Sequence, residues 1–387
     1  MYVERVSCIP RGFSQNRDCA VAAQELFDAI YHPEAALSVF FCSTDYDLPT
    51  LERELNGRFA GIPLIGCTSA SEITPAGYMT GGIVGFSLLG PEFVSVAAPI
   101  RNLRNFSMAD CHRIVRDLRK ELDESSGGMP EDNTFAFLMI DGLSKCEEMV
   151  LSAISSALGD IPMFGGSAGG GLSFQRSYVF EKGRFHSDAA VLALVRTGLP
   201  FTLFTNDHFV HSETKMVVTE ADPASRIVSE INAEPAGREY ARLVGLDVDH
   251  LTPMMFATHP VVVKVGGRYY TRSIQKVNED ESLTFFCAID KGIVLTVARG
   301  TDPLENTRAL FDNIHREIGV PQLVIGCDCV LRSLELEEKQ LKHAVGQLFA
   351  NNNVIGFGTY GEQYQAMHVN QTFTGAAIGF RIPHRSL

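Results

Sequence analysis

The sequence has no tryptophan, no excess of basic residues and no apolar run long enough to cross a membrane. Its 387 residues carry a formal net charge of -13 at pH 7, whereas nucleic acids and anionic membrane surfaces are bound through basic patches. The first residues also lack the basic-then-apolar order of a signal peptide. We therefore expect a cytoplasmic protein whose partners include neither nucleic acid nor a membrane.

Recognisable catalytic motifs are scarce as well. There is no phosphate-binding loop ending in Gly-Lys-Ser/Thr and no His-Glu-x-x-His zinc motif. The nine cysteines are odd in number and scattered through apolar stretches, which indicates reduced thiols rather than a disulfide framework. Cys327 and Cys329 follow a predicted strand and are compatible either with a soft-metal or redox site or with small, half-buried side chains. Since no nucleophile comes with an evident base, we do not expect an enzyme.

One pattern of elements recurs three times along the chain. Each copy has a strand, an amphipathic helix, a second strand, a loop of small residues and a third strand. The copies span residues 37–86, 135–194 and 322–380. This repeat predicts an α/β fold of two lobes, with mixed sheets flanked by helices. We place the lobes at residues 30–198 and 199–382, because Gly198-Leu199-Pro200 interrupts the pattern.

Two further helices are predicted in the second lobe. The pair Asp222-Pro223 has the form of a helix N-cap followed by proline, so a helix is expected to continue to Ile231. In the third copy, the apolar spacing predicts a single amphipathic helix from Leu334 to Phe349.

The small-residue loops are the first candidate binding site. A glycine opens the loop in the first and third copies, Gly66 and Gly356, and six residues later each is followed by a glutamate, Glu72 and Glu362. Tyr360 lies in the third loop. Small residues let a backbone approach a ligand closely, and loops at strand ends are common ligand rims. The glutamates are then anchors for a polar or cationic ligand, an acid/base pair, or caps for backbone amides at the loop ends.

Three histidines and an arginine form the second candidate. His208 lies in an extended connection before Phe209, so it is compatible with an axial haem ligand beside an apolar ring. His259 and His368 are either further ligands or structural groups bonded to backbone carbonyls. Arg272 lies in an aromatic strand, where it either grips a carboxylate such as a haem propionate or forms a surface ion pair.

A series of separate motifs identifies a family. The motifs are Leu64-Ile65-Gly66-Cys67-Thr68-Ser69, Val218-Thr219-Glu220-Ala221-Asp222, Ile231-Asn232-Ala233-Glu234-Pro235-Ala236 with Tyr240, and Gly358-Thr359-Tyr360-Gly361-Glu362. In this order they resemble the FIST N and FIST C domains, a bacterial sensory module. The resemblance covers about residues 30–382 and implies a sensory, ligand-binding role in signal transduction.

A second set of segments resembles the nitric oxide sensing proteins within that superfamily. These segments are residues 207–210, 256–263, 282–290, 327–329 and 361–375. The resemblance implies a bound haem b, nitric oxide as the signal and a sensor histidine kinase as the partner, in two-component control of biofilm formation. It ranks His208 first as the metal ligand. The remaining cofactor-binding candidates are His368, His259, Phe209 and Arg272.

A haem-free sensory protein is the alternative interpretation. It would bind a small metabolite at the glycine-rich loop rims, through Gly66, Glu72, Tyr360 and Glu362. The sequence leaves the oligomeric state open, a homo-oligomer included.

Overall fold

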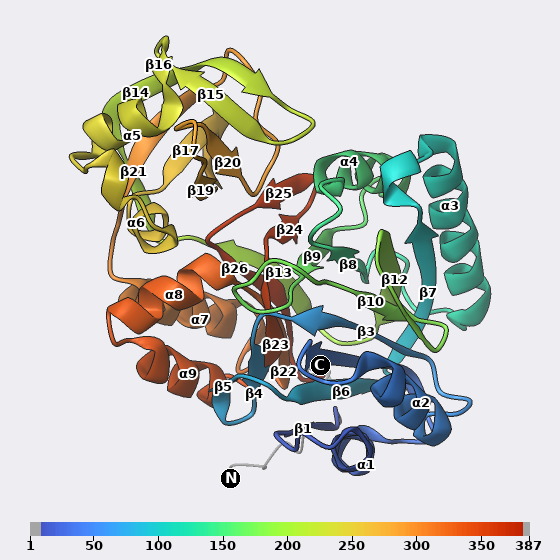
Figure 1. The fold of residues 1–387 in the computed structure, drawn as a ribbon. Coiled ribbons are helices and arrows are strands. Elements are labelled where there is room, and N and C mark those ends of the chain that lie inside the picture. Colours follow the sequence, from blue (N-terminus) through green and yellow to red (C-terminus); the bar gives the residue numbers. More distant parts are fainter. Residues whose placement is uncertain (1–8, 382–387) are drawn as a thin grey trace.

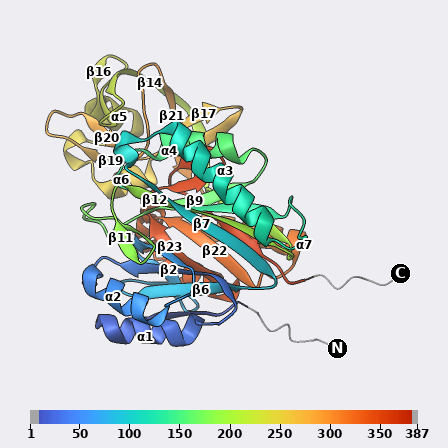
Figure 2. The same cartoon turned by 90° about the vertical axis from the view of Figure 1, so that its right-hand side faces the viewer.

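The computed structural model describes residues 9–381, in which one unit occurs three times around a common centre (Figures 1 and 2). Each repeat contributes four strands of a mixed sheet, helices on one face of that sheet and a short hairpin. An inserted lobe, residues 207–302, separates the first strand of the third repeat from the rest of it. The predicted α/β fold of two lobes, built on a strand–helix–strand–loop–strand repeat, is confirmed.

The first two repeats follow each other directly in the chain. The first repeat contains β1 (Arg11–Ser14), α1 (Cys19–Ile30), β2 (Ala35–Ser43), α2 (Leu48–Arg58), β3 (Leu64–Ser69), β4 (Glu72–Thr74), β5 (Gly77–Met79) and β6 (Ile83–Leu89). The second contains β7 (Phe93–Arg101), η1 (Leu103–Asn105), α3 (Met108–Ser125), β8 (Thr134–Asp141), α4 (Glu147–Leu158), β9 (Met163–Ala168), β10 (Val179–Glu181), β11 (Arg184–His186) and β12 (Ala189–Thr197).

The third repeat encloses the inserted lobe. The repeat contains β13 (Phe201–Asn206), α7 (Pro303–Ile318), β22 (Leu323–Cys329), α8 (Val330–Glu338), α9 (Lys342–Asn351), β23 (Val354–Thr359), β24 (Glu362–Tyr364), β25 (Met367–Val369) and β26 (Phe373–Ile378). The lobe contains β14 (Phe209–Asp222), β15 (Ile227–Ile231), β16 (Glu234–Pro235), α5 (Ala236–Val244), η2 (Val248–His250), α6 (Pro253–Thr258), β17 (Val261–Val265), β18 (Arg268–Arg272), β19 (Ile274–Val277), β20 (Leu283–Phe285) and β21 (Val294–Gly300).

The three repeats exchange their hairpins in a ring. Hairpin β4–β5 of the first repeat joins the sheet of the third, β10–β11 of the second joins the sheet of the first, and β24–β25 of the third joins the sheet of the second. No repeat therefore completes its own sheet. Each hairpin covers one edge strand of the neighbouring sheet, β3, β9 or β23, so these three strands are not open to pairing with another chain.

One shared core fills the space between the sheets. Apolar side chains from β2, β8, β22 and their neighbours form it, and Phe41 of the first repeat stacks on Phe357 of the third, with ring centroids 4.3 Å apart. The opposite face of each sheet packs on its own helices in a separate cluster. The alternating strand residues are therefore buried on both faces, which explains the continuous apolar runs in the sequence.

The sequence Asp-Pro occurs twice, and it starts a helix at Asp302-Pro303 but forms a turn at Asp222-Pro223. Asp302 caps α7 by accepting hydrogen bonds from the amides of Leu304 and Glu305, as its proline-following pattern predicts. The helix predicted after Asp222-Pro223 is wrong, because this pair forms the turn of hairpin β14–β15. Ile227 and Val228 then continue as an extended, β-branched strand that pairs with β20.

The single helix predicted from Leu334 to Phe349 is also wrong. The chain forms two helices, α8 and α9, with Gln340 between them at a φ of 56°. The apolar residues on both sides of the break face the same core cluster, so their spacing alone does not reveal it.

Candidate functional site

The three small-residue loops do meet at the centre of the ring. Ala70 of the first repeat donates to the carbonyl of Gly358 in the third (2.9 Å), and Ser167 of the second donates to the carbonyl of Gly361 (2.8 Å). The amide of Tyr360 donates in return to the carbonyl of Ser167 (3.1 Å). The loop backbones therefore bond to one another, and this pairing occupies the groups that a ligand rim would offer.

Close approach of neighbouring strands explains the repeated glycine. A Cβ on Gly66 would lie 2.5 Å from the carbonyl oxygen of Phe40 on the adjacent strand. Cβ atoms on Gly165 and Gly356, the matching positions, would overlap the carbonyl oxygens of Leu138 and Gly326. Since ordinary contacts to a Cβ are 3.4 Å or longer, each position requires glycine for strand packing.

Glu72 and Glu362 are buried caps. Glu72 accepts hydrogen bonds from Ser69 Oγ (2.5 Å) and from the amide of Gly82 (3.2 Å). Glu362 accepts from Thr359 Oγ1, and from the amide and hydroxyl of Thr372 (3.1 and 2.8 Å). Both side chains are fully buried. These contacts match the capping interpretation of the two glutamates.

In the second repeat a different residue caps the matching backbone amide. This amide belongs to Asp188, which lies just before the last strand of its repeat, as Gly82 and Thr372 do in the other repeats. Asp141 at the end of β8 accepts from this amide (2.6 Å) and from Ser177 Oγ. A buried carboxylate at this point is therefore part of the fold in all three repeats.

A pH dependence follows from the burial of the two glutamates. Burial raises the pKa of Glu72 to about 7 and that of Glu362 to about 8, above the unfolded value of about 4.3. A group with a raised pKa binds its proton more tightly in the folded state, and this stabilises the fold. The stabilisation is fully present below about pH 4 and is lost as the pH rises through the folded-state pKa values. We expect Glu362→Gln, which keeps the shape and an acceptor oxygen, to gain stability relative to the wild type between about pH 5 and 8. Urea unfolding across this range measures it, and a difference that stays constant with pH would contradict it.

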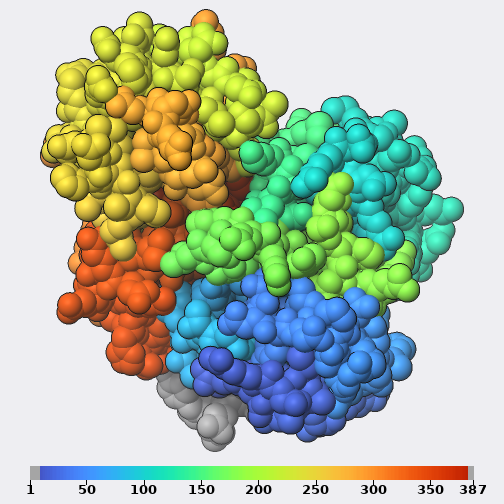
Figure 3. Space-filling view, in the orientation of Figure 1, coloured from blue at the N-terminus to red at the C-terminus, as the bar shows by residue number. Residues whose placement is uncertain are grey.

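Tyr360 holds the long loop of the second repeat. Its hydroxyl donates to the carbonyl of Gly171 (2.7 Å) and accepts from the amide of Gly170 (2.9 Å). Phe174 in this loop packs on Tyr360 and on Phe286 of the inserted lobe, with ring centroids 4.7 and 5.3 Å apart. In Figure 3 the green surface of this loop lies at the front, where the repeats and the inserted lobe meet. The centre of the ring is therefore closed by aromatic side chains.

The thiols and the central serine lack the surroundings of nucleophiles. Burial raises the pKa of Cys327 and Cys329 well above its usual range, so both remain neutral thiols. Ser167 belongs to a Gly-x-Ser-x-Gly match, residues 165–169, that the sequence analysis overlooked. It lies within β9 instead of on a strand-to-helix turn, is fully buried, and accepts a hydrogen bond from Gln363 (2.9 Å). Neither group is set up for attack on a substrate.

Arg272 and His368 meet where the inserted lobe contacts hairpin β24–β25. An Nη of Arg272 donates to the carbonyl of His368 (3.1 Å). The His368 ring is buried, its Nδ1 lies 3.3 Å from Gln363 Nε2, and it packs on Gly361. Burial lowers the pKa of His368 to about 4, so the ring is neutral. This pair fastens the lobe to the ring.

His208 lies in the connection between β13 and β14 and is buried. Its Nε2 is 2.9 Å from Oε2 of Glu335 on α8, and its ring packs on Phe209 with centroids 4.3 Å apart. Both side chains are only 1% exposed. The nitrogen that most often ligates iron is therefore engaged with a carboxylate.

His259 lies on the wall of a cavity between the inserted lobe and α8. Its Nδ1 is 3.0 Å from the hydroxyl of Thr258 and 3.2 Å from the carbonyl of Met255, and residues 9–381 provide no hydrogen-bond partner for its Nε2. In the tautomer that donates from Nδ1 to this carbonyl, Nε2 is a lone-pair donor, as in metal-ligating histidines. The cavity has a volume of about 480 Å³. Its walls are formed by Ser212, Thr214, Leu243, Val244, Thr258, His259, Val297, Ala298, Arg299, Gly300, Glu335 and Lys339.

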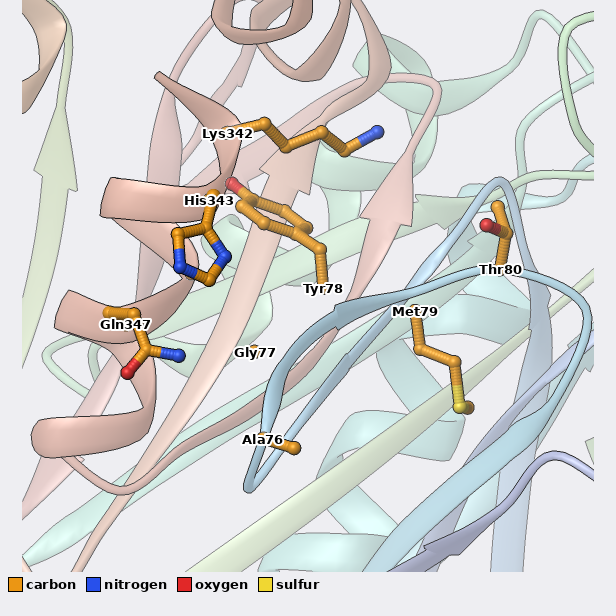
Figure 4. Close-up of a pocket in the computed structure, with 9 residues that line it drawn as sticks. Ala76, Gly77, Tyr78, Met79, Thr80, Lys342, His343 and Gln347 are labelled. Atoms are coloured by element: carbon orange, nitrogen blue, oxygen red, sulfur yellow. The ribbon is translucent and has the colours of Figure 1, made fainter. Parts of the chain in front are cut away.

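A smaller cavity lies where hairpin β4–β5 crosses α9 (Figure 4). Tyr78 occupies its centre, and Lys342, His343 and Gln347 reach it from the helix. The Tyr78 hydroxyl is already committed to Asp328 at 2.6 Å. At about 250 Å³ this cavity is below the range of about 300–1,000 Å³ that is typical of ligand sites. The inter-lobe cavity is therefore the better candidate.

Several residues at the lobe contacts escaped the sequence analysis. Arg226 donates to Glu147 (2.6 Å) and Glu148 (2.7 Å) of α4, and to the carbonyl of Phe286. We call Arg226, Glu147 and Glu148 the Arg226 cluster. No local motif marks these residues, because their partners are about eighty positions away in the chain.

Residues 9–381 hold no group of three or more His, Cys, Asp or Glu side chains arranged to bind a metal ion. None of the helices in the same range combines the length and apolar character of a membrane span.

Comparison with known proteins gives a consistent picture. Residues 36–234 match the FIST N domain, and residues 236–365 match the FIST C domain. An uncharacterized protein of Methanocaldococcus jannaschii is 23% identical over 382 residues, covering 87% of this chain and 72% of its own. A cyanuric acid hydrolase from A. caulinodans, at 9% identity, covers 96% of this chain and 99% of its own with a TM-score of 0.38.

Proposed function

Because this chain belongs to the family of FIST N and FIST C domain proteins, whose domains are sensors in signalling, we propose that it senses nitric oxide through a bound haem. It reports to a partner sensor histidine kinase in the cytoplasm. The observation that carries the proposal is the inter-lobe cavity with His259 on its wall. Its volume of about 480 Å³ lies within the range that is typical of cofactor sites.

The cavity walls match the chemistry of a haem. His259 would hold the iron through Nε2, with its Nδ1 within reach of the Met255 carbonyl (3.2 Å). Arg299 and Lys339 provide positive charge for the two carboxylates of the ring. Apolar contact comes from Leu243, Val244 and Val297. A bound haem would supply an iron that can bind nitric oxide.

Residues of the chain on both sides of the cavity would couple the cofactor to the position of the lobe. His259 holds the cofactor against the inserted lobe, whereas Lys339 holds it against α8 of the ring. A ligand that contacts both parts stabilises one arrangement of the lobe relative to others, provided that its affinity differs between them. A kinase that binds one arrangement preferentially then responds to the ligand.

We expect the autophosphorylation rate of the partner kinase, measured with this protein present, to change when nitric oxide is added.

A hemin titration of the purified full chain tests the proposal. We expect a Soret band that moves on addition of nitric oxide. His259→Ala should weaken hemin binding at least about tenfold, or about 1.4 kcal/mol, because the axial bond is lost. His250→Ala is the matched control, since His250 is an exposed histidine of the same lobe. His208→Phe should keep the band, because His208 is paired with Glu335.

Two outcomes would change the assignment. If His259→Ala titrates like the wild type and His208→Phe loses the band, the iron ligand is His208. If the wild type binds no hemin, the haem-free alternative is favoured, and thermal shifts against a panel of small metabolites become the next measurement.

A further inference from the structure

The inserted lobe is joined to the ring by two short crossings of the chain. Asp207-His208 connects β13 to β14, and Thr301-Asp302 connects β21 to α7. The two crossings are bonded at one point, because the amide and hydroxyl of Thr301 both donate to the carbonyl of His208 (2.7 and 2.8 Å). Both covalent connections between the lobe and the ring therefore run through this point, and a rotation of the lobe would change the backbone angles here.

The side chain of His208 fixes that point to the ring. Its Nε2 bonds to Oε2 of Glu335 on α8 (2.9 Å), and Oε1 of the same carboxylate accepts from Lys339 Nζ (2.7 Å). Burial opposes the charge on Glu335, yet the bonds from His208 and Lys339 lower its pKa below the usual range. Lys339 and Glu335 both line the inter-lobe cavity. One carboxylate therefore connects the crossing to the wall of the cavity.

We propose that His208 and Glu335 form a hinge that transmits occupation of the inter-lobe cavity to the position of the inserted lobe on the ring. This inference rests on the proposed function. An acidic group of the ligand competes with Glu335 for Lys339. The carboxylate then keeps only its bond to His208, and the crossing moves with it.

A second contact between the lobe and the ring, with α4, is where movement of the lobe would be detected. There the Arg226 cluster and the contact of Glu148 with the amide of Ala288 (2.5 Å) join the lobe to α4. Lys145 of the ring also donates to the carbonyl of Ser225 (3.1 Å). Because the lobe is held at both ends, movement at the hinge changes how often this far contact opens.

Hydrogen exchange on the full chain tests the hinge, with hemin as the probe. In the wild type, hemin should change amide protection at residues 223–228 by about tenfold. In His208→Phe the ring fills the same space but cannot bond to Glu335. This variant should bind hemin and show no change at residues 223–228. His315→Phe is the matched control. His315 lies in α7 and does not line the cavity, and the substitution removes its bond to Asn352 (2.7 Å).

A second measurement without hemin separates the hinge from the proposed function. In the ligand-free protein, His208→Phe should lower protection at residues 223–228 about tenfold, whereas His315→Phe should not. If both variants protect these amides as the wild type does, the hinge is refuted even where hemin binds. If the wild type binds no hemin but the ligand-free effect appears, the hinge stands and the haem assignment fails.

Discussion

Gly356→Ala is expected to destabilise the protein by about 3 kcal/mol or more, and to prevent folding if the ring is only marginally stable. The added Cβ would overlap the carbonyl oxygen of Gly326 on the parallel neighbour β22. That oxygen belongs to a backbone in the centre of a six-stranded sheet, so it cannot rotate away as a side chain would. Urea unfolding followed by circular dichroism measures the loss of stability.

The matched control for this substitution is Gly57→Ala. Gly57 lies in α2, is exposed, and a Cβ built on it meets no atom within 4 Å. Alanine is favoured over glycine in a helix, so this variant should gain about 0.5–1 kcal/mol. Equal stability of the two variants would contradict our explanation of the small-residue motif and would restore a ligand-facing role for the glycines.

Arg226→Ala is expected to cost about 3–5 kcal/mol in the contact between the inserted lobe and the ring. The guanidinium is 3% exposed and neutralises Glu147, whose side chain is 2% exposed. Removing the arginine leaves the buried carboxylate without a partner, and burial already raises the pKa of Glu147 to about 7. Native-state hydrogen exchange at residues 223–228 reports the free energy of opening of this contact directly.

Two further variants test whether unpaired charge causes this loss. Arg238→Ala, in the same lobe, removes an exposed ion pair with Glu281 and should change stability little. The triple variant Arg226→Met, Glu147→Gln, Glu148→Gln should recover most of the loss, because no charge remains buried alone. A triple variant as unstable as Arg226→Ala would show that the packing of the arginine, and not its charge, holds the lobe.

Local sequence determined the repeat and most of its elements. The helices at residues 19–30, 147–158 and 303–318 follow from apolar spacing and from caps such as Asp18 and Asp302, which act within a few residues of the chain. The same short-range rules failed at Asp222-Pro223. There both a helix and a turn satisfy the local signal, and pairing of β15 with β20, some fifty residues later, selects the strand.

Tertiary structure alone decided what the marked residues do. Glu72, Glu362, Gly66 and Tyr360 were prominent in the sequence because three repeats must fit together, and their contacts bind the ring to itself. His259 gained its place on the cavity only through the position of α8, and Glu335, Lys339 and Arg226 carry no local motif. Charges and cavities are formed by residues that are distant in the chain. Their roles depend on burial and distance, which a sequence pattern does not contain.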